Sequence, residues 1–399
     1  MINQVPERVD VVVCGAGPAG LVAAWRMAQA GLSVALLDRR DPWREPVSCA
    51  EAVHAEGLRK WVDEIDPAWV RGPVDGVVFV APDETRIEYT QYRSGLILDR
   101  ALMHKGLAER AFAAGAKIHF RANILRLERS GEEWLVHCTL ESVQDYTISC
   151  RAVIDASGPG GKLTKGIAGL EALEDGAFDL EPAVFTILEG IDYPSTLIEL
   201  GFSQRRFPGG YGWVFPRDAH SANVGLVIGK EHLAKSSPRK LLQQWLAERW
   251  PNVKVGTFYG GAIACGQSNK PLAALGLFKV GDAASMVNPI SRSGIVEGMK
   301  GGALAAKSVH AWLNAPSPEQ RKAIEANLFA DWMELQGENH ARLHRAKSAF
   351  GSIPDPVFDR AAHRILSIPV AKRSLFRIFL STLLGSPMLL WRMRSLMGF

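Results

Sequence analysis

Cysteine is scarce in this sequence of 399 residues, and no two cysteines form a Cys-x-x-Cys pair. Five cysteines, an odd number that is widely scattered, argue against a disulfide framework and against a zinc knuckle. Long apolar runs are also missing, since none reaches the ~20 residues of a membrane-spanning helix. No basic and then apolar signal segment precedes the first predicted strand. We therefore expect a protein without a metal site that resides in a reducing cytoplasm.

Acidic residues are absent after Asp359, although the whole chain carries a formal net charge of only +4. So small a charge does not by itself suggest nucleic-acid binding. Helices that mix basic and apolar residues can lie on an anionic membrane surface, here at the inner face of the membrane. They can equally form a helical cap on the core with a solvated basic face, and both interpretations stay open. The basic residues of this region are Arg360, Arg364, Lys372, Arg373, Arg377, Arg392 and Arg394.

What the sequence does contain is a nucleotide-binding fingerprint close to its start. An apolar run predicts a buried parallel strand, and three glycines follow it as Gly15-x-Gly17-x-x-Gly20. Gly15 allows a tight turn, Gly17 lets the backbone approach a pyrophosphate, and Gly20 lets the next helix pack closely on the strand. That helix offers its N-terminal N–H groups to the phosphates. Asp38 ends the second strand, where a carboxylate can bind ribose hydroxyls. The segment therefore predicts a dinucleotide site rather than a glycine-rich structural turn.

A second unit of strand, Gly-x-Gly-x-x-Gly loop and helix is missing. Gly158-Pro159-Gly160-Gly161 and Gly209-Gly210 lack the flanking strand and helix. The chain therefore has no permanent nicotinamide domain. NAD(P)H or an electron-donor protein would have to dock transiently, and the sequence does not choose between them.

Residue patterns divide the chain into three regions. Helices at about 50–62 and 98–114, together with short apolar strands that end at 152–155, continue the parallel sheet around a small hairpin meander. From about 181 to 266, alternating and aromatic-rich runs predict antiparallel strands. We therefore predict an α/β fold with a Rossmann-like domain, an inserted antiparallel-sheet substrate domain and a helical C-terminal region. Their predicted bounds are 1–72, 93–180 and 270–317 for the first, 73–92 and 181–269 for the second, and 318–399 for the third.

Further motifs follow the fingerprint in chain order. They are Ser48-Cys49-Ala50-Glu51-Ala52, Leu98-Asp99-Arg100, Asp155-Ala156-Ser157-Gly158, Gly210-Tyr211-Gly212-Trp213-Val214-Phe215-Pro216, and Gly281-Asp282-Ala283-Ala284 with Asn288-Pro289 and Gly294-Ile295. Over roughly residues 9–310 they resemble FAD-dependent oxidoreductases with the para-hydroxybenzoate-hydroxylase-like fold. The first and fourth motifs are similar to the Cys-Gly-Glu-Gly and Tyr-x-Trp-x-Phe-Pro segments of the geranylgeranyl reductase family. The resemblance implies that the Rossmann-like domain binds FAD and that reduced flavin transfers a hydride to C=C bonds of a polyprenyl or other long apolar substrate.

Fingerprint and resemblance together indicate which residues meet the FAD. Asp282 would bind cofactor hydroxyls, unless it only caps a helix, and the helix that starts at Gly294 would point its positive end at the flavin. Arg100 would contact the flavin or pair with a carboxylate, and Asp155 would meet the cofactor or cap its own turn. The full expected set is Gly15, Gly17, Ala19, Gly20, Asp38, Arg39, Cys49, Ala50, Arg100, Asp155, Gly158, Gly281, Asp282, Ser293, Gly294 and Ile295.

Cys49 is the leading candidate for catalysis, with Glu51 beside it. A free cysteine is usually a small buried hydrophobe, whereas in the resembling family this cysteine lies by the flavin and the reacting double bond. Saturation of an alkene needs a hydride at one carbon and a proton at the other. Cys49 or a water would supply that proton, and Glu51 and His54 are close enough in sequence to help. Such a role requires that Cys49 is partly exposed and near the cofactor.

Tyr211, Trp213 and Phe215 alternate and therefore share one face of a strand. They predict either a sheet core or, as the resemblance favours, the wall of an apolar substrate tunnel. Pro289 and Arg292 complete the predicted substrate residues.

Arg292 also suggests an alternative function, because the family usually has glycines at this point of the loop. An arginine there favours an FAD-dependent monooxygenase or dehydrogenase that acts on an aromatic or carrier-bound intermediate. A third hypothesis is a degenerate flavoprotein without activity that docks through its basic C-terminus.

Overall fold

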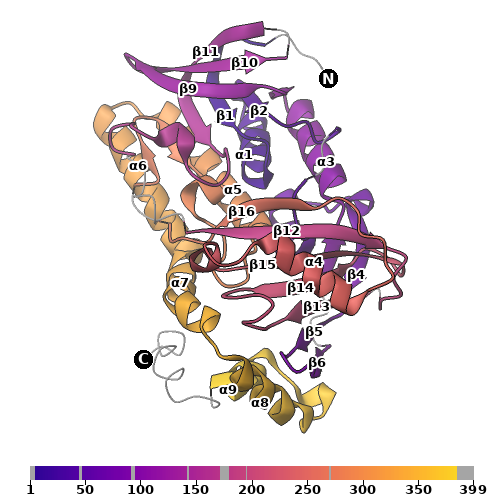
Figure 1. Ribbon diagram of the computed structural model, residues 1–399. Coiled ribbons are helices and arrows are strands. Elements are labelled where there is room, and N and C mark those ends of the chain that lie inside the picture. The colour runs from indigo at the N-terminus through magenta and orange to yellow at the C-terminus, as the bar shows by residue number, and fades with distance from the viewer. Residues whose placement is uncertain are drawn as a thin grey trace.

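The computed structural model describes residues 5–44, 47–90, 95–141, 143–170, 179–194, 196–268 and 271–383. These residues form an eight-stranded sheet, a seven-stranded sheet and a small three-stranded sheet, with helices packed around them (Figure 1). The eight-stranded sheet is largely parallel, and the seven-stranded sheet is largely antiparallel and lies beside it. The predicted α/β class, with an inserted antiparallel sheet and a helical C-terminal region, is confirmed.

The eight-stranded sheet holds the fingerprint at its centre. Its inner strands are apolar on both faces, as a covered parallel sheet requires: Val11 and Val13 face one core, and Val12 and Cys14 face the other. Helices α1 (Pro18–Gln29), α3 (Arg100–Ala113) and α5 (Ile295–Leu313) contribute to the first of these cores. The strand order is β17 (Ala273–Ala274), β18 (Leu277–Lys279), β11 (Val143–Asp155), β1 (Arg8–Cys14), β2 (Val34–Asp38) and β8 (Lys117–Phe120).

Strand β11 joins two parts of this sheet that the sequence separates. Apolar runs at 146–149 and 152–155 predict two strands, but the structure has one. Its first part pairs antiparallel with β10 (Glu133–Leu140), which pairs in turn with β9 (Asn123–Ser130). Its last part runs parallel to β1. Ser149 and Cys150 pair on both sides, so the backbone ladder continues where the sequence pattern changes.

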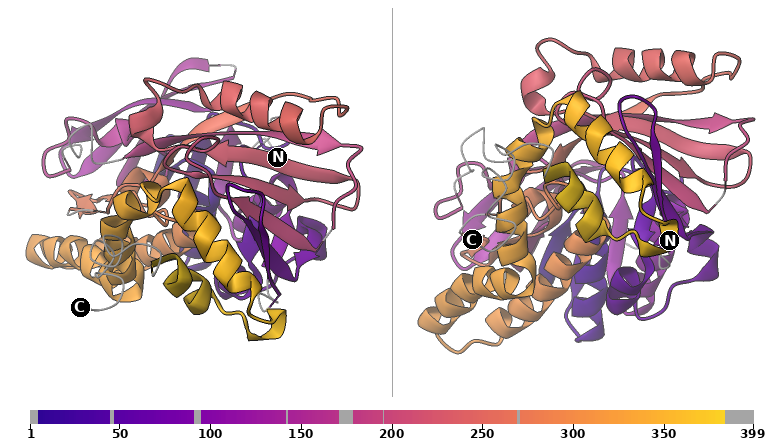
Figure 2. Two further views of the ribbon diagram at one scale, coloured as in Figure 1. Left: turned by 60° about the horizontal axis from the view of Figure 1, so that its bottom comes forward. Right: turned by 90° about the horizontal axis from the view of Figure 1, so that it is seen from below.

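The seven-stranded sheet is built from two distant stretches of chain. One face packs against α4 (Pro238–Arg249), which lies across it in Figure 2. The other face carries the aromatic side chains of β14 (Tyr211–Pro216) and packs against Ala50 and Ala52. The strand order is β16 (Tyr259–Ala264), β12 (Leu180–Glu189), β15 (Ser221–Val227), β14 (Tyr211–Pro216), β13 (Leu197–Gly201), β5 (Gly76–Val80) and β6 (Arg86–Tyr89).

The three-stranded sheet ties the cysteine motif to the rest of the molecule. It consists of β3 (Ala52–His54), β7 (Gly95–Leu98) and β4 (Val70–Val74). The helix predicted from about residue 50 begins later, as α2 (Ala55–Val62). Pairing of β3 with β7 keeps residues 52–54 extended, and the His54 side chain then caps α2 by accepting from the Gly57 N–H at 3.3 Å.

The C-terminal region is helical, as predicted. It contains α6 (Pro318–Trp332), a π-helical turn over Met333–Gly337, α7 (Glu338–Gly351), α8 (Asp355–Leu366) and α9 (Leu375–Leu383). Helices α8 and α9 pack against β6 at the far end of the molecule (Figure 1). In the described ranges, no helix combines the length and the apolar character that crossing a bilayer requires.

Candidate active site

The glycine loop is tight where the fold needs contact and open where a phosphate would lie. Gly15 has φ +112°, and a Cβ there would sit 2.3 Å from the Ala156 carbonyl oxygen. A Cβ at Gly20 would sit 1.9 Å from the Gly15 carbonyl oxygen, so α1 packs closely on β1. At Gly17 nothing lies within 4 Å of the Cβ position. Helix α1 begins directly after Gly17, and no side chain caps it. Its first N–H groups are therefore available to a ligand.

Asp38 lies beside this loop, as the fingerprint predicts. Its Oδ2 accepts the Ala16 N–H at 2.6 Å, and its Oδ1 accepts the Arg40 N–H at 2.7 Å. Burial raises the pKa of the Asp38 carboxyl, while the two backbone donors oppose the rise. The Arg39 side chain next to it is exposed. Binding of a ribose by these two residues stays a prediction.

Asp155 shapes its own turn at the end of β11. The side chain is 0% exposed, and its Oδ1 accepts the N–H and Oγ–H of Ser157 at 3.0 and 2.6 Å. These contacts support the capping alternative for Asp155, and binding of the cofactor by this residue stays a prediction. Gly158 follows Ser157 directly, has φ +91° and completes the turn.

Helix α5 reaches the glycine loop because small residues face Ala19. A Cβ at Gly302 would lie 2.1 Å from the Ala19 carbonyl oxygen, and one at Gly281 would lie 3.1 Å from the Ala19 Cβ. Ala19 thus serves as the contact point between α1 and α5. These contacts place the turn after β18 and the start of α5 next to the glycine loop. Gly294 precedes α5, and no side chain caps that helix either.

Asp282 lies at this convergence of strand end and helix start. It is half-buried, and its Oδ1 is 3.7 Å from the Cβ position of Gly294. Burial raises the pKa of Asp282 to about 6, against the opposing effects of the Ala264 backbone N–H and the Arg100 charge. Ile295 and Pro289 are buried close by in sequence, and the Ser293 carbonyl accepts the Asn288 N–H at 2.9 Å. The loop from residue 288 to 294 is therefore closed on itself.

Cys49 is partly exposed and lies against the flavin-domain core. Its Sγ accepts the Arg100 Nη1–H at 2.8 Å and the Glu51 N–H at 3.2 Å. Arg100 is buried in turn, and its Nη2 donates to His104 Nε2 at 2.9 Å. The arginine that the resemblance assigns to the cofactor is thus held between the cysteine and a buried histidine.

Glu51 ties the cysteine segment to the seven-stranded sheet. Its φ is +76°, a conformation that is uncommon for residues other than glycine. Its carboxylate is 3.1 Å from Arg217 Nε, beyond the end of β14. Burial raises the pKa of Glu51, and the Arg217 charge opposes the rise. The same segment is anchored through its backbone, because Asn223 Nδ2 donates to the Cys49 carbonyl oxygen at 2.8 Å.

The aromatic residues of β14 share one face and turn it toward the cysteine segment. Trp213 lies 6.3 Å from both Tyr211 and Phe215 between ring centroids. Trp213 and Phe215 belong to an apolar cluster that Ala50 and Ala52 also join. Trp213 Nε1 donates to Asn223 Oδ1 at 2.9 Å, so one asparagine connects the aromatic strand to the cysteine backbone.

Arg292 is almost fully enclosed by the protein. Its side chain is 3% exposed, and its Nε donates to Glu181 Oε2 at 2.8 Å. Its other contacts are the carbonyl oxygens of Ile290 and Gly209 at 2.6 and 3.2 Å and the face of the Tyr211 ring. Arg292 therefore has a structural role, and contact with a substrate stays a prediction for it. The ion pair with Glu181 accounts for an arginine at this position without recourse to a monooxygenase or dehydrogenase.

Three residues at the site escaped the sequence analysis: His104, Asn223 and Glu181. His104 follows Arg100 by four residues on a predicted helix, so the (i, i+4) spacing could have revealed it. Asn223 and Glu181 lie on strands far from their partners, and no local pattern marks them.

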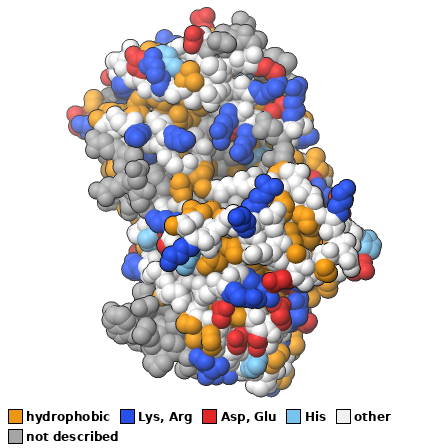
Figure 3. All heavy atoms as spheres, in the orientation of Figure 1, with side chains coloured by type: hydrophobic (Ala, Val, Ile, Leu, Met, Phe, Trp, Pro, Cys, Tyr) orange, Lys and Arg blue, Asp and Glu red, His pale blue; other side chains and the backbone are white. Residues whose placement is uncertain are grey.

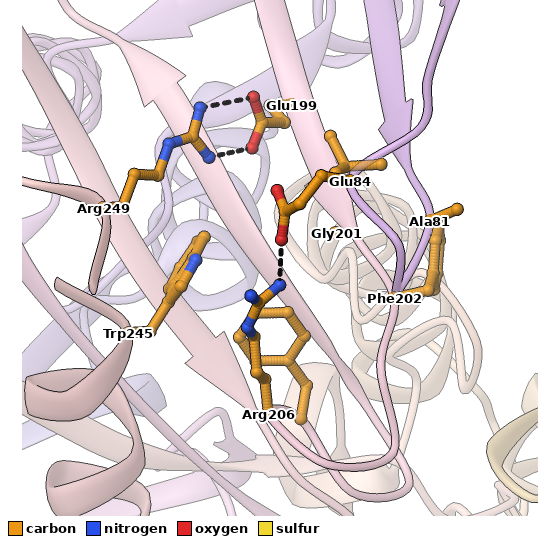
Figure 4. Close-up of a pocket in the computed structure, with 10 residues that line it drawn as sticks. Ala81, Glu84, Glu199, Gly201, Phe202, Arg206, Trp245 and Arg249 are labelled. Atoms are coloured by element: carbon orange, nitrogen blue, oxygen red, sulfur yellow. Dashed lines mark hydrogen bonds and ion pairs between the residues drawn. The ribbon is translucent and has the colours of Figure 1, made fainter. Parts of the chain in front are cut away.

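A separate hollow lies on the α4 side of the seven-stranded sheet (Figure 4). Its charged side chains already pair with one another: Arg249 with Glu199, and Arg206 with Glu84. Arg86 Nη2 adds a further contact to Glu199 at 2.7 Å. Each charged side chain that lines the hollow therefore already has an oppositely charged partner.

The residues at the first site fit FAD. Two helix N-termini without side-chain caps and the open space at Gly17 suit a pyrophosphate. The buried Arg100 Nε has no partner among the described residues and is available to an anionic or hydrogen-bonding group of the cofactor.

Comparison with known proteins agrees with this geometry. A family model described as the geranylgeranyl reductase catalytic domain matches residues 179–263, and a lycopene cyclase model matches 10–184. A digeranylgeranylglycerophospholipid reductase of Methanosarcina mazei is 30% identical over 400 aligned positions, which cover 98% of this chain and 96% of that protein. The chain belongs to the geranylgeranyl reductase family. The protein with this sequence is therefore an FAD-dependent oxidoreductase, as the resemblance implied.

Solved structures share the fold over almost the whole length. A geranylgeranyl bacteriochlorophyll reductase-like protein of Thermoplasma acidophilum superposes with a TM-score of 0.86 at 22% identity, covering 98% of this chain and 99% of that one. A myxobacterial chondrochloren halogenase, described as FAD-dependent, gives a TM-score of 0.67 at 18% identity, with 98% of each chain covered. The geranylgeranyl reductase homologue thus uses a scaffold that also occurs in a halogenase.

Proposed function

We propose that this protein saturates C=C double bonds in the polyprenyl chains of a lipid, with FAD as its cofactor. The observation that carries the proposal is the position of Cys49, between the flavin-domain core and the aromatic face of the seven-stranded sheet. The curated relative's name, a reductase of a digeranylgeranyl glycerophospholipid, supports this substrate class.

The aromatic face suits an isoprenoid chain. Trp213 and Phe215 form an apolar cluster with Phe185 and Ile198, and Tyr211 and Tyr259 border it. A chain of methyl-branched isoprene units presents no hydrogen-bonding group and gains binding energy from burial against such a surface, at about 25 cal/mol per Å². Ala50 and Ala52 of the cysteine segment pack against this face with small side chains.

Bound FAD supplies the hydride when it is reduced. Cys49 Sγ gives the proton to the other carbon of the double bond, so the double bond becomes a single bond with two new C–H bonds. The thiolate that remains recovers its proton from solvent, because Cys49 is partly exposed. We assign Glu51 a positioning role instead of the predicted catalytic one, since its carboxylate contacts Arg217 and its N–H contacts Cys49 Sγ.

The test is a reduction assay on FAD-loaded protein with strong chemical reductant and digeranylgeranyl glycerophospholipid. We expect wild type to add hydrogen to the lipid chains, as seen by mass spectrometry. Cys49→Ala should lower the rate roughly a hundredfold or more, the usual contribution of a general acid. Ser48→Ala is the matched control, because Ser48 is exposed and makes no described contact in the site. If FAD-loaded wild type leaves the mass of every prenyl lipid unchanged, the proposed function is wrong.

We further propose that a lipid surface meets the end of the molecule formed by α8 and α9. Leu366, Val370 and Phe376 are 49%, 36% and 69% exposed there, and hydrophobic side chains lie among basic and acidic ones at this end (Figure 3). Part of the predicted basic face has a structural role, because Arg373 is buried and donates to the Glu88 carbonyl oxygen at 3.0 Å. Arg392 and Arg394 lie outside the described residues. A transiently docked donor, NAD(P)H or a protein, would reduce the flavin.

A further inference from the structure

The sulfur of Cys49 accepts hydrogen bonds from two N–H donors. Arg100 Nη1 lies 2.8 Å away on α3, and the Glu51 N–H lies 3.2 Å away within the cysteine segment itself. Both groups donate an N–H, so the sulfur is the acceptor in each contact. Any S–H bond therefore points elsewhere, and a negative charge on the sulfur is met by two hydrogen bonds as soon as the proton leaves.

The Arg100 guanidinium is fixed by a neutral partner. His104 lies one helical turn further along α3 and is 7% exposed. Burial and the Arg100 charge hold the pKa of His104 well below its usual range, so the imidazole is uncharged at neutral pH. Because arginine can only donate, His104 Nε2 accepts the bond at 2.9 Å. This bond holds the planar guanidinium so that its other terminal nitrogen faces Cys49.

No carboxylate forms an ion pair with Arg100 among the described residues. Asp282 and Arg100 interact only from a distance, and the Arg100 charge merely opposes the rise in the Asp282 pKa that burial causes. Glu51 pairs with Arg217, and Asp99 pairs with Arg71 at 2.5 Å. The buried positive charge of Arg100 is therefore not neutralised by an acidic side chain, and it stays available to an anion at Cys49.

We propose that His104 is a positioning residue: as a neutral acceptor, it aims Arg100 at Cys49 and thereby stabilises the Cys49 thiolate. This inference rests on the proposed function only for its purpose, which is to make Cys49 an effective proton donor. When the Cys49 S–H bond breaks, the proton goes to the substrate carbon, and the electron pair stays on the sulfur beside Arg100. An acidic residue at position 104 would pair with Arg100 and remove that benefit.

The experiment measures alkylation of Cys49 in the holoenzyme by iodoacetamide as a function of pH. The other four cysteines are buried, and burial raises the pKa of each of them, so labelling reports Cys49. Peptide mass spectrometry assigns the site, and Cys49→Ser must abolish the label. The comparison uses His104→Leu, which removes the acceptor, His104→Gln, which restores one, and His104→Asp, which gives Arg100 a counter-ion.

We expect His104→Leu and His104→Asp to move the pH midpoint of alkylation upward. Labelling at pH 7 should then slow roughly tenfold for every pH unit by which the midpoint rises. His104→Gln should stay close to wild type. Equal midpoints in wild type and His104→Leu, or an equally raised midpoint in His104→Gln, would overturn the inference. If His104→Leu does not fold, an unchanged midpoint in His104→Asp overturns it instead. Because no lipid enters this assay, its outcome is independent of whether the protein reduces polyprenyl chains.

Discussion

Arg292 shows how one residue can occupy a position that favours glycine. Its φ is +58°, which costs roughly 1–2 kcal/mol for a side chain with a Cβ. The ion pair with Glu181 and two backbone carbonyl contacts compensate for this cost. Lys347 Nζ adds a contact of 2.7 Å to the same glutamate, so α7 and β12 hold the loop together. The loop thus keeps a backbone conformation that favours glycine, while the Arg292 side chain stabilises the fold.

Asp282 gives a prediction at the same scale, because its burial costs stability in the absence of FAD. The folded pKa of about 6 lies above the unfolded value of about 3.9. Between these values the folded protein binds more protons, so stability falls as pH rises through this window and the loss is complete above the folded pKa. In urea unfolding of the apoprotein, Asp282→Asn should gain about 1–3 kcal/mol at pH 7.5 and little at pH 4.

The same substitution should weaken FAD binding, since Asp282 lies at the start of α5 where the cofactor is expected. Flavin release measured by fluorescence checks this. Asp145→Asn is the control, because Asp145 is exposed near the start of β11. An equal gain at both pH values would contradict the assigned titration.

At the scale of elements, the contact between α1 and α5 sets the site. Gly302 allows the two helices to approach until the Cβ position is 2.1 Å from the Ala19 carbonyl oxygen. Both helices begin at the cofactor region, after Gly17 and Gly294 respectively. Any change in their separation therefore moves the N–H groups of two helix starts at once.

Gly302→Ala should consequently separate α1 from α5, at a cost of about 1–3 kcal/mol in stability. FAD affinity should fall together with the melting temperature. Gly298→Ala is the matched control on the same helix, because its Cβ would make an ordinary contact of 3.5 Å with Ala19. Thermal unfolding and flavin titration of both variants measure the difference. Comparable behaviour of the two variants would show that the close approach does not hold the site.

At the scale of the whole molecule, one seven-stranded sheet carries both the aromatic face formed by β14 and the strand β6 against which the α8–α9 end packs. Helix α8 packs against β6, and the interaction of Asp359 Oδ1 with the Asp83 N–H at 3.0 Å fixes it there. His363 adds a contact of 2.8 Å to the Asp83 carboxylate. The two helices are thus a cap on the sheet, and this cap still exposes apolar side chains.

Flotation with vesicles that contain anionic phospholipid tests whether this cap meets lipid. We expect wild type to float with anionic vesicles and to be released by high salt, since basic side chains contribute. Phe376→Asp should reduce flotation severalfold, because Phe376 is 69% exposed. Leu125→Asp is the control, an exposed apolar residue on β9 that is remote from the cap. Equal losses in both variants would argue against a specific lipid surface.

Much of the scaffold could be predicted because its signals are local. The helix predicted at about 98–114 is α3 (Arg100–Ala113), since periodicity and flanking residues define its ends. The cysteine segment was harder: the pattern after residue 50 suits a helix, but pairing of β3 with β7 overrides it at 52–54. The burial of Asp155 and the ion pair of Arg292 were not foreseen, because both depend on partners that no local pattern reveals.

Local sequence was enough to find the glycine loop, the acid at the end of β2 and the aromatic alternation of β14, because backbone geometry within a few residues specifies them. The folded chain alone reveals that Asn223 binds the backbone of Cys49, 174 positions away, and that Glu181 pairs with the side chain of Arg292, 111 positions away. Folding also turns Arg100 to Cys49 and His104 rather than to a carboxylate. The physical reason is that such contacts form only when distant segments are brought together by burial of apolar surface, which no short stretch of sequence encodes.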